Sequence, residues 1–197
     1  MAAILLASGF SKRFGRQDKL LFPFKGKPLA RYTLELAAGI CFSGGLFFVA
    51  ASDEVAALAA DLHSVTVLRN NAPEKGLRES VRLGVEAVQA EYYIFFPCDQ
   101  PFLDAETIRL ILEARQPGRI VEPRYRGRPG NPCLFSDVFR EELLTLKDGE
   151  TPRVLKTRHP EAIVGVEINN ALALEDVDDE EVMETLLKNP GWYIEHF

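Results

Sequence analysis

Two short runs of apolar residues constrain the fold of this chain more than any other feature. They lie at residues 46–49 and 92–96, and neither shows the alternation of apolar and polar side chains that a half-exposed strand requires. Strands that are apolar on both sides occur in sheets that helices cover on both faces. The sequence therefore predicts a central sheet between two layers of helices.

Strand-like and helix-like segments alternate along the chain. We predict strands at residues 3–6, 45–50, 65–69, 92–97, 119–122, 132–135 and 162–166. We predict helices at residues 29–38, 53–62, 77–90, 105–115, 138–144, 152–157 and 180–188. Asp53 and Asp104 stand where helix N-caps are expected. This alternation predicts an α/β fold with a doubly wound, mainly parallel sheet, in which ligands bind outside the carboxyl ends of the strands.

Length and charge limit the classes of function. A chain of 197 residues without an internal repeat fits a single domain over residues 1–197. A net charge of −6 favours neither a nucleic acid nor a membrane surface as partner, so an anionic ligand must meet a local basic site. Apolar runs stay short of membrane-spanning length, and residues 2–6 resemble a strand rather than a leader, which predicts a cytoplasmic protein.

The three cysteines, Cys41, Cys98 and Cys133, are scattered along the chain. Their odd number and wide spacing favour neither a disulfide framework nor a zinc site. We expect them to be buried, reduced thiols.

The loop after the first predicted strand has the composition of a phosphate-binding segment. It reads Leu-Ala-Ser-Gly-Phe-Ser-Lys-Arg-Phe-Gly over residues 6–15, and Lys19 follows. Small residues let backbone N–H groups approach an anion, and the hydroxyl and cationic side chains add donors for a triphosphate. The spacing matches neither the dinucleotide-binding nor the Walker A motif. From local composition alone, a solvated surface loop is an equally good interpretation.

Acidic residues stand at two places where a metal ion would need them. Asp99 follows the predicted strand at residues 92–97, and its carboxylate could hold Mg²⁺ together with phosphate oxygens. A turn-forming aspartate before Gln-Pro is the alternative. An acidic run at residues 175–181 could add a second carboxylate, although such residues also stabilise the start of a helix.

Five segments, in order along nearly the whole chain, carry a family resemblance. They are Leu6-Ala7-Ser8-Gly9 with Ser11, Arg13, Gly15 and Lys19; Gly-Leu-Arg-Glu-Ser-Val-Arg-Leu-Gly from Gly76 to Gly84; Cys98-Asp99-Gln100-Pro101; Gly127-Arg128-Pro129-Gly130-Asn131-Pro132; and Asp176-Val177-Asp178. Together they resemble the motifs of the MobA-like nucleotidyltransferases, and most of all those of the molybdenum cofactor cytidylyltransferase branch. The resemblance implies a Rossmann-like nucleotidyltransferase fold.

The resemblance also implies a role for each matching residue. Lys19 would stabilise charge on the α-phosphate, Arg13 would hold the leaving pyrophosphate, and Asp99 would bind Mg²⁺ with Asp178 or Asp176. The remaining implied contacts with the NTP are Ala7, Ser8, Gly9, Ser11 and Gly15, with Gly76 and Ser80 lining the base pocket. The implied contacts with the acceptor's anionic end are Arg128, Asn131 and Arg153.

The implied reaction transfers CMP from CTP to a phosphorylated small molecule, molybdopterin in this branch, with release of pyrophosphate. A molybdoenzyme would then receive the cofactor. Ser8 favours CTP, because the guanylyl branch has glycine there and leaves more room beside the loop. The chain departs from the family pattern at residues 148–153 and 176–181, so the acceptor is less well defined than the reaction. A guanylyltransferase, a sugar- or polyol-phosphate nucleotidyltransferase and a non-catalytic nucleotide-binding delivery module stay open.

Overall fold

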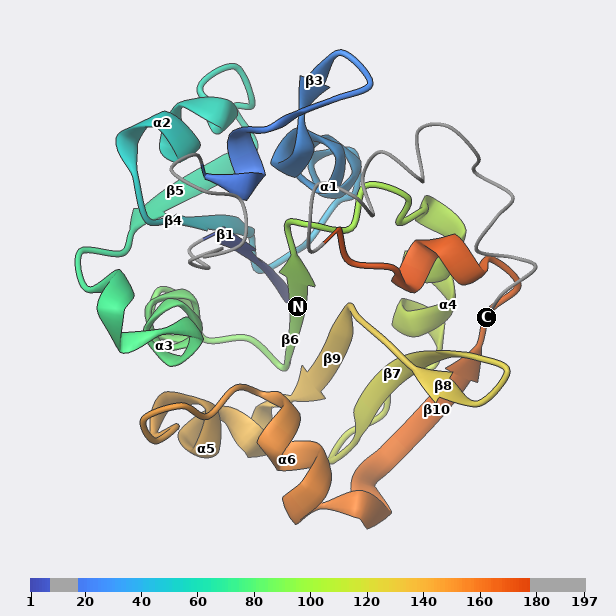
Figure 1. Ribbon diagram of the computed structural model, residues 1–197. Helices are drawn as coiled ribbons and strands as arrows, with labels where there is room; N and C mark the ends of the chain where they lie inside the picture. The colour runs from blue at the N-terminus through green and yellow to red at the C-terminus, as the bar shows by residue number, and fades with distance from the viewer. Residues whose placement is uncertain (8–17, 178–197) are drawn as a thin grey trace.

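The computed structural model describes residues 1–7 and 18–177 (Figure 1). These residues form an eight-stranded sheet in the order β10-β7-β9-β6-β1-β4-β5, with β8 paired to β7. The strands are β1 (Ala2–Ala7), β4 (Leu46–Ala50), β5 (Val65–Arg69), β6 (Tyr92–Pro97), β7 (Ile120–Tyr125), β8 (Arg128–Pro129), β9 (Cys133–Ser136) and β10 (Ile163–Glu167). The predicted strands are therefore all present.

The sheet is mainly parallel, as predicted. β1 pairs in parallel with both β4 and β6, β4 with β5, and β7 with β10. Two strands differ: β9 runs antiparallel between β6 and β7, and the short β8 pairs antiparallel with β7. Ala7 and Pro97, the last residues of β1 and β6, therefore lie at one edge of the sheet, where the amino end of β9 also begins.

Helices cover both faces of this sheet (Figure 1). They are α1 (Leu29–Ala38), α2 (Asp53–Ala56), α3 (Leu77–Glu86), α4 (Ala105–Glu113), α5 (Arg140–Leu144) and α6 (Arg153–Arg158). In the view of Figure 1, α1, α2 and α4 lie above the sheet and α3, α5 and α6 lie below it. Alternate residues of β1 serve the two layers: Leu5 packs with α1 and α4, whereas Ile4 packs with α3 and α5. This arrangement confirms the doubly wound α/β fold.

Helix starts were predicted with mixed success. Asp104 is the N-cap of α4, where its side chain accepts a hydrogen bond of 2.7 Å from the backbone N–H of Thr107. The prediction for Asp53 was wrong, because Ser52 caps α2 by accepting from the N–H of Val55 and Asp53 is the first helical residue. A serine is as good a cap as an aspartate, and sequence alone did not rank the two. The helix predicted at residues 180–188 lies outside the described residues.

Two hairpins were not predicted. β2 (Pro23–Phe24) and β3 (Lys27–Pro28) form a small two-stranded sheet, with a turn at Lys25 and Gly26 that has φ values of 44° and 90°. The second hairpin lies between the strands predicted at residues 119–122 and 132–135, where β7 continues to Tyr125 and β8 folds back on β7. Both hairpins are too short to show a periodic pattern in the sequence.

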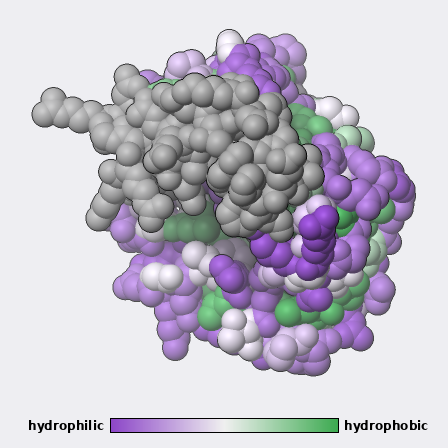
Figure 2. Space-filling view, turned by 45° about the vertical axis from the view of Figure 1, so that its right-hand side comes forward, coloured by the Kyte–Doolittle hydropathy of each residue, from purple (hydrophilic) through white to green (hydrophobic). Residues whose placement is uncertain are grey.

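The surface formed by residues 1–7 and 18–177 gives little sign of a large apolar interface. On the face in Figure 2, hydrophilic residues dominate and hydrophobic ones form small patches among them. Within the described ranges, only Val67 and Val138 are large hydrophobic residues with exposed side chains. None of the helices in the same ranges has the length and apolar character needed to cross a bilayer.

Candidate active site

The carboxyl ends of the parallel strands β1 and β6 define the candidate site. Ala7 is the last residue of β1 and is fully buried. The segment that follows it lies outside the described residues. The roles expected of Ser8, Gly9, Ser11, Arg13 and Gly15 therefore stay predictions.

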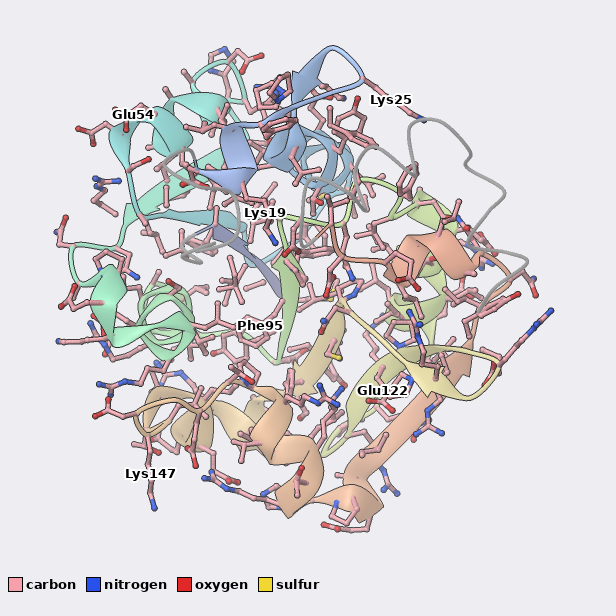
Figure 3. All side chains as sticks on the ribbon, viewed as in Figure 1. Lys19, Lys25, Glu54, Phe95, Glu122 and Lys147 are labelled. Atoms are coloured by element: carbon pink, nitrogen blue, oxygen red, sulfur yellow. The ribbon has the colours of Figure 1, made fainter. Side chains whose placement is uncertain are left out.

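Lys19 and Asp99 meet at this edge of the sheet. Lys19 begins a 3₁₀ turn (Lys19–Leu21), which Asp18 caps by accepting from the N–H of Leu20 at 2.9 Å. Asp99 lies two residues beyond the end of β6. The ammonium Nζ of Lys19 donates to Asp99 Oδ2 at 2.7 Å, and the two side chains are 11% and 21% exposed. Figure 3 shows Lys19 near the upper end of β6. Residues separated by 80 positions thus form one largely buried ion pair.

The other carboxylate oxygen of Asp99 could accept a metal ion. Asp99 Oδ1 is buried and has no hydrogen-bond partner among the described residues. An unpartnered buried oxygen is costly, which favours a ligand at this atom. The described part of the chain holds no cluster of three His, Cys, Asp or Glu side chains that would bind a metal without help. One carboxylate oxygen fits Mg²⁺, which takes most of its other ligands from phosphates and water.

The chain beyond β10 returns to Asp99. The backbone N–H of Val177 donates to the carbonyl oxygen of Asp99 at 2.9 Å, and Gln100 Nε2 donates to the carbonyl of Leu174 at 3.3 Å. In Figure 1 this segment passes from the short 3₁₀ helix Ala171–Leu174 to the end of β6. Asp176 is exposed, and Asp178 lies outside the described residues. The choice of a second metal ligand therefore stays a prediction.

The segment expected to line the base pocket begins α3. Gly76 has a φ of +74°, is exposed, and has nothing within 4 Å of the position that a Cβ atom would take. Ser80 is fully buried, and its Oγ accepts a hydrogen bond of 2.9 Å from Asn70 Nδ2. Asn70 follows β5, so Ser80 fixes the loop between β5 and α3. The contact of these residues with a base stays a prediction.

A pocket of about 210 Å³ lies beside this edge of the sheet. Asn131 and Arg153, both expected to bind the acceptor, line it. Arg128 is not among the lining residues; its side chain is half exposed and forms an ion pair with the largely buried carboxylate of Glu175. The structure therefore brings two of the three expected acceptor contacts into one pocket, and joins the third to the segment that leads back to Asp99.

Sequence reasoning missed three polar groups near this pocket. Lys156 and Cys133 line it, and Lys156 pairs with the buried carboxylate of Glu122 at 2.8 Å. Burial raises the pKa of the Cys133 thiol to about 11, although the nearby Lys156 acts in the opposite direction. The sequence signal that could have indicated this ion pair is the glutamate at the end of the apolar run at residues 120–122, because a buried carboxylate needs a buried partner.

The expectation that all three cysteines are buried was partly wrong. Cys98 and Cys133 are buried, whereas Cys41, in the turn after α1, is exposed. All three are free thiols, as expected. Cys41 stands between Ile40 and Phe42, so the local sequence does not indicate that its side chain is exposed.

The sequence matches a known family over most of its length. The model of the MobA-like NTP transferase domain matches residues 3–163. The chain therefore belongs to the MobA-like NTP transferase family, and its fold is that of a nucleotidyltransferase within that superfamily.

Curated relatives cover nearly the whole chain. A nicotine blue oxidoreductase from Paenarthrobacter nicotinovorans is 27% identical over 95% of this chain and 96% of its own. The molybdenum cofactor cytidylyltransferase of Escherichia coli K12 is 28% identical, over 89% of each chain. A molybdenum cofactor guanylyltransferase from Ralstonia pickettii is 24% identical, over 94% of this chain and 95% of its own. This chain is thus similar to proteins whose names give different activities.

Solved structures share the fold. A nucleotidyl transferase from Methanothermobacter has a TM-score of 0.79 at 20% identity and covers 100% of this chain and 98% of its own. A Mycobacterium tuberculosis H37Rv protein, solved as a complex with manganese, has a TM-score of 0.71 at 24% identity, over 95% of this chain and 97% of its own. At these identities the likeness shows the fold alone.

Proposed function

We propose that this chain transfers CMP from CTP to a phosphorylated acceptor of the molybdopterin type, releasing pyrophosphate. The observation that carries the proposal is the Lys19–Asp99 pair at the carboxyl edge of the sheet, with Asp99 Oδ1 buried and free of partners within the described residues. A cation and a metal-binding carboxylate side by side are what a triphosphate requires. The similarity to the molybdenum cofactor cytidylyltransferase of Escherichia coli supports CMP transfer as the proposed reaction.

The chemistry that we assign to this chain is positioning and charge neutralisation. The acceptor phosphate is ionised at neutral pH, so attack on the α-phosphorus needs no general base. Lys19 neutralises charge that builds up on the α-phosphate, and Arg13 holds the outgoing pyrophosphate. Asp99, with Asp178 as the second carboxylate, would hold Mg²⁺, which when bound would supply Lewis-acid stabilisation of the phosphate charge. Asn131 and Arg153 orient the acceptor in the pocket.

The preference for CTP over GTP rests on Ser8. A side chain there takes space that glycine leaves open, and a pyrimidine needs less room than a purine. A difference of this size is worth about 1–3 kcal/mol, or roughly 10–200-fold in discrimination. The steric argument therefore predicts a clear preference for CTP, which hydrogen bonds from residues 76–80 to the base would modify.

A panel assay tests this proposal. Wild-type protein is incubated with Mg²⁺, each of the four NTPs and a series of acceptor phosphates, and pyrophosphate release is measured. We expect release with CTP and a molybdopterin-type acceptor, and a lower kcat/KM with GTP. A GTP preference would remove the cytidylyl assignment, and release only with sugar or polyol phosphates would replace the acceptor. Binding of NTP without any turnover would favour a delivery module.

One observation favours a second candidate, an oxidoreductase. The relative named nicotine blue oxidoreductase matches 95% of this chain, slightly more than the cytidylyltransferase does. The same protein preparation should therefore be mixed with nicotine blue, the dye in that relative's name, and a soluble electron donor. Bleaching of the dye without pyrophosphate release in the panel assay would replace the transferase proposal.

Three wider expectations belong to the same proposal. We propose that residues 1–197 form one nucleotidyltransferase domain, that it works in the cytoplasm, and that a molybdoenzyme receives the product. Neither a nucleic acid nor a membrane takes part. A pull-down of the full chain with a candidate molybdoenzyme, in the presence and absence of product, tests the last transfer.

A further inference from the structure

The pocket beside the catalytic edge has one apolar wall and one cationic wall. Leu6, Leu77, Phe95 and Phe135 supply the apolar wall, from β1, α3, β6 and β9. Figure 3 labels Phe95, which comes from the lower part of β6. At about 210 Å³ the pocket is smaller than the ~300–1,000 Å³ of sites that enclose a whole ligand. It therefore fits one part of a substrate rather than a nucleotide and an acceptor together.

The cationic wall belongs to α6. Arg153 and Lys156 are three residues apart, so they lie on the same side of this helix, and both line the pocket. Arg153 is exposed, and none of the described carboxylates lies within ion-pairing distance of it. Lys156 is 15% exposed and lies deeper. One end of the pocket thus carries two positive charges beside an apolar wall.

Glu122 fixes the position of Lys156. Its side chain is 4% exposed, on the face of β7 that also presents Ile120 to the lower helix layer. One carboxylate oxygen accepts from Arg124 Nη2 at 2.9 Å, and the other accepts from Lys156 Nζ at 2.8 Å. Figure 3 shows Glu122 on β7, in the interior of the molecule. A lysine is normally flexible, and this ion pair orders it before any ligand arrives.

The positive charge around Glu122 exceeds what is needed to neutralise this one carboxylate. Arg124 already provides Glu122 with a cation, with a second contact from Nε at 3.0 Å. Lys156 and Arg153 add two positive charges at the pocket against this one carboxylate. Lys156 Nζ donates to Glu122 and, at 3.6 Å, to Cys133 Sγ, which leaves one of the three N–H groups of the ammonium for a ligand. An anionic group of a ligand would complete this arrangement.

We propose that Lys156, positioned by Glu122, binds an anionic group of the acceptor and selects acceptors in which this group is attached to a flat apolar ring. The inference rests on the proposed function, because it concerns the acceptor of that reaction. A ring packs against the partly exposed Leu77 and Pro97 of the pocket without loss, whereas each hydroxyl of a polyol chain needs a hydrogen-bond partner. Asn131 and Thr151 are the uncharged polar side chains that line the pocket. An unpaired hydroxyl lowers affinity, so polyol phosphates bind more weakly.

The test measures binding of two simple probes without NTP. Phenyl phosphate carries a ring and a phosphate, and glycerol 3-phosphate carries a polyol chain and the same phosphate. Affinities for the full chain are measured by calorimetry for the wild type, Lys156→Gln, Lys156→Arg, Glu122→Gln and the control Lys147→Gln. Lys147 is exposed in the loop before α6, and Figure 3 shows it at the periphery of the molecule.

We expect the wild type to bind phenyl phosphate more tightly than glycerol 3-phosphate, by about tenfold or more. Lys156→Gln should weaken phenyl phosphate by about tenfold or more, through loss of a charge-assisted hydrogen bond. Lys156→Arg should keep part of the affinity for phenyl phosphate that Lys156→Gln loses. Glu122→Gln should weaken phenyl phosphate binding less than Lys156→Gln does. The affinity of Lys147→Gln should stay within about twofold of wild type. In turnover assays, Lys156→Gln should raise the KM of the acceptor and leave that of the NTP unchanged.

Several results would overturn the inference. If a folded Lys156→Gln variant binds phenyl phosphate as tightly as the wild type does, Lys156 is only a counter-ion of Glu122. The probe would then bind at another phosphate-binding segment. Equal affinities for the two probes would remove the selection for a ring. If Lys156→Gln does not fold, the double variant Glu122→Gln/Lys156→Gln, which buries no unpaired charge, takes its place. Because the binding assay contains no NTP, its outcome is independent of whether CMP transfer is observed.

Discussion

Replacing Lys19 by methionine removes the ammonium group beside Asp99 and keeps a side chain of similar length. The two charged atoms are 2.7 Å apart, and the side chains are 11% and 21% exposed. Removing one partner of a buried pair costs about 3–5 kcal/mol, because the remaining charge is left without compensation. Asp99 keeps some contact with water, so we expect a loss of about 2–3 kcal/mol in the free energy of unfolding.

The effect on turnover should be larger than the effect on substrate binding. Loss of one positioned donor from a catalytic site lowers the rate by about 10²–10³. We therefore expect Lys19→Met to lower kcat by this factor and to change the KM of the NTP much less, since the contact strengthens in the transition state. Urea unfolding at pH 7 gives the stability, and pyrophosphate release at saturating NTP gives kcat.

A double variant makes the stability test sharper. Lys19→Met/Asp99→Asn removes both charges, so its stability loss should be smaller than the sum of the two single losses. The reasoning is refuted if Lys19→Met costs less than about 0.5 kcal/mol, the range of an exposed pair, or if the two losses are additive. A change in KM with kcat intact would show that Lys19 binds ground state and transition state alike.

Two further predictions concern stability. Gly130→Ala should lower the free energy of unfolding, measured in urea, by about 1–3 kcal/mol, because the new Cβ would lie 2.9 Å from the side chain of Leu174 and would push residues 171–177 away from the loop. Gly39→Ala is the control, because its Cβ would meet no atom closer than 3.4 Å, and it should change the stability little. Burial raises the pKa of Cys133 from 9.0 to about 11, so the unfolded chain loses this proton first and stability should fall as the pH rises from 9 to 11. Cys133→Ala should remove up to about 2.7 kcal/mol of this loss of stability between pH 9 and 11, measured as the difference in unfolding free energy between wild type and variant at each pH. Equal pH profiles of stability for the two proteins would contradict the raised pKa of Cys133.

The parts of the fold set by local patterns could be predicted from the sequence. β6 and α1 have the predicted bounds, because their apolar residues repeat with the period of a buried strand and of a helix. The helices predicted at residues 53–62 and 77–90 are shorter in the structure. Their ends depend on how the last turns pack against the sheet, which periodicity does not report.

The site could be predicted as far as strand order implies it. Asp99 was expected at the carboxyl edge because it follows a buried strand, and the structure pairs it with Lys19 there. The ion pairs of Glu122 with Lys156 and of Arg128 with Glu175 could not be predicted. Each joins distant segments whose contact depends on the antiparallel strand β9 and on the return of the chain to Asp99, and neither feature leaves a local pattern.

The most direct test of the central claim, that Lys19 and Asp99 form a nucleotidyl-transfer site, compares pyrophosphate release by the wild type and Asp99→Asn. Both are assayed with CTP, a molybdopterin-type acceptor and Mg²⁺, and circular dichroism confirms that the variant is folded. We predict release by the wild type and a loss of about 10²-fold or more in Asp99→Asn, as expected when a positioned electrostatic contact is removed. A folded Asp99→Asn variant that releases pyrophosphate at the wild-type rate would contradict the account.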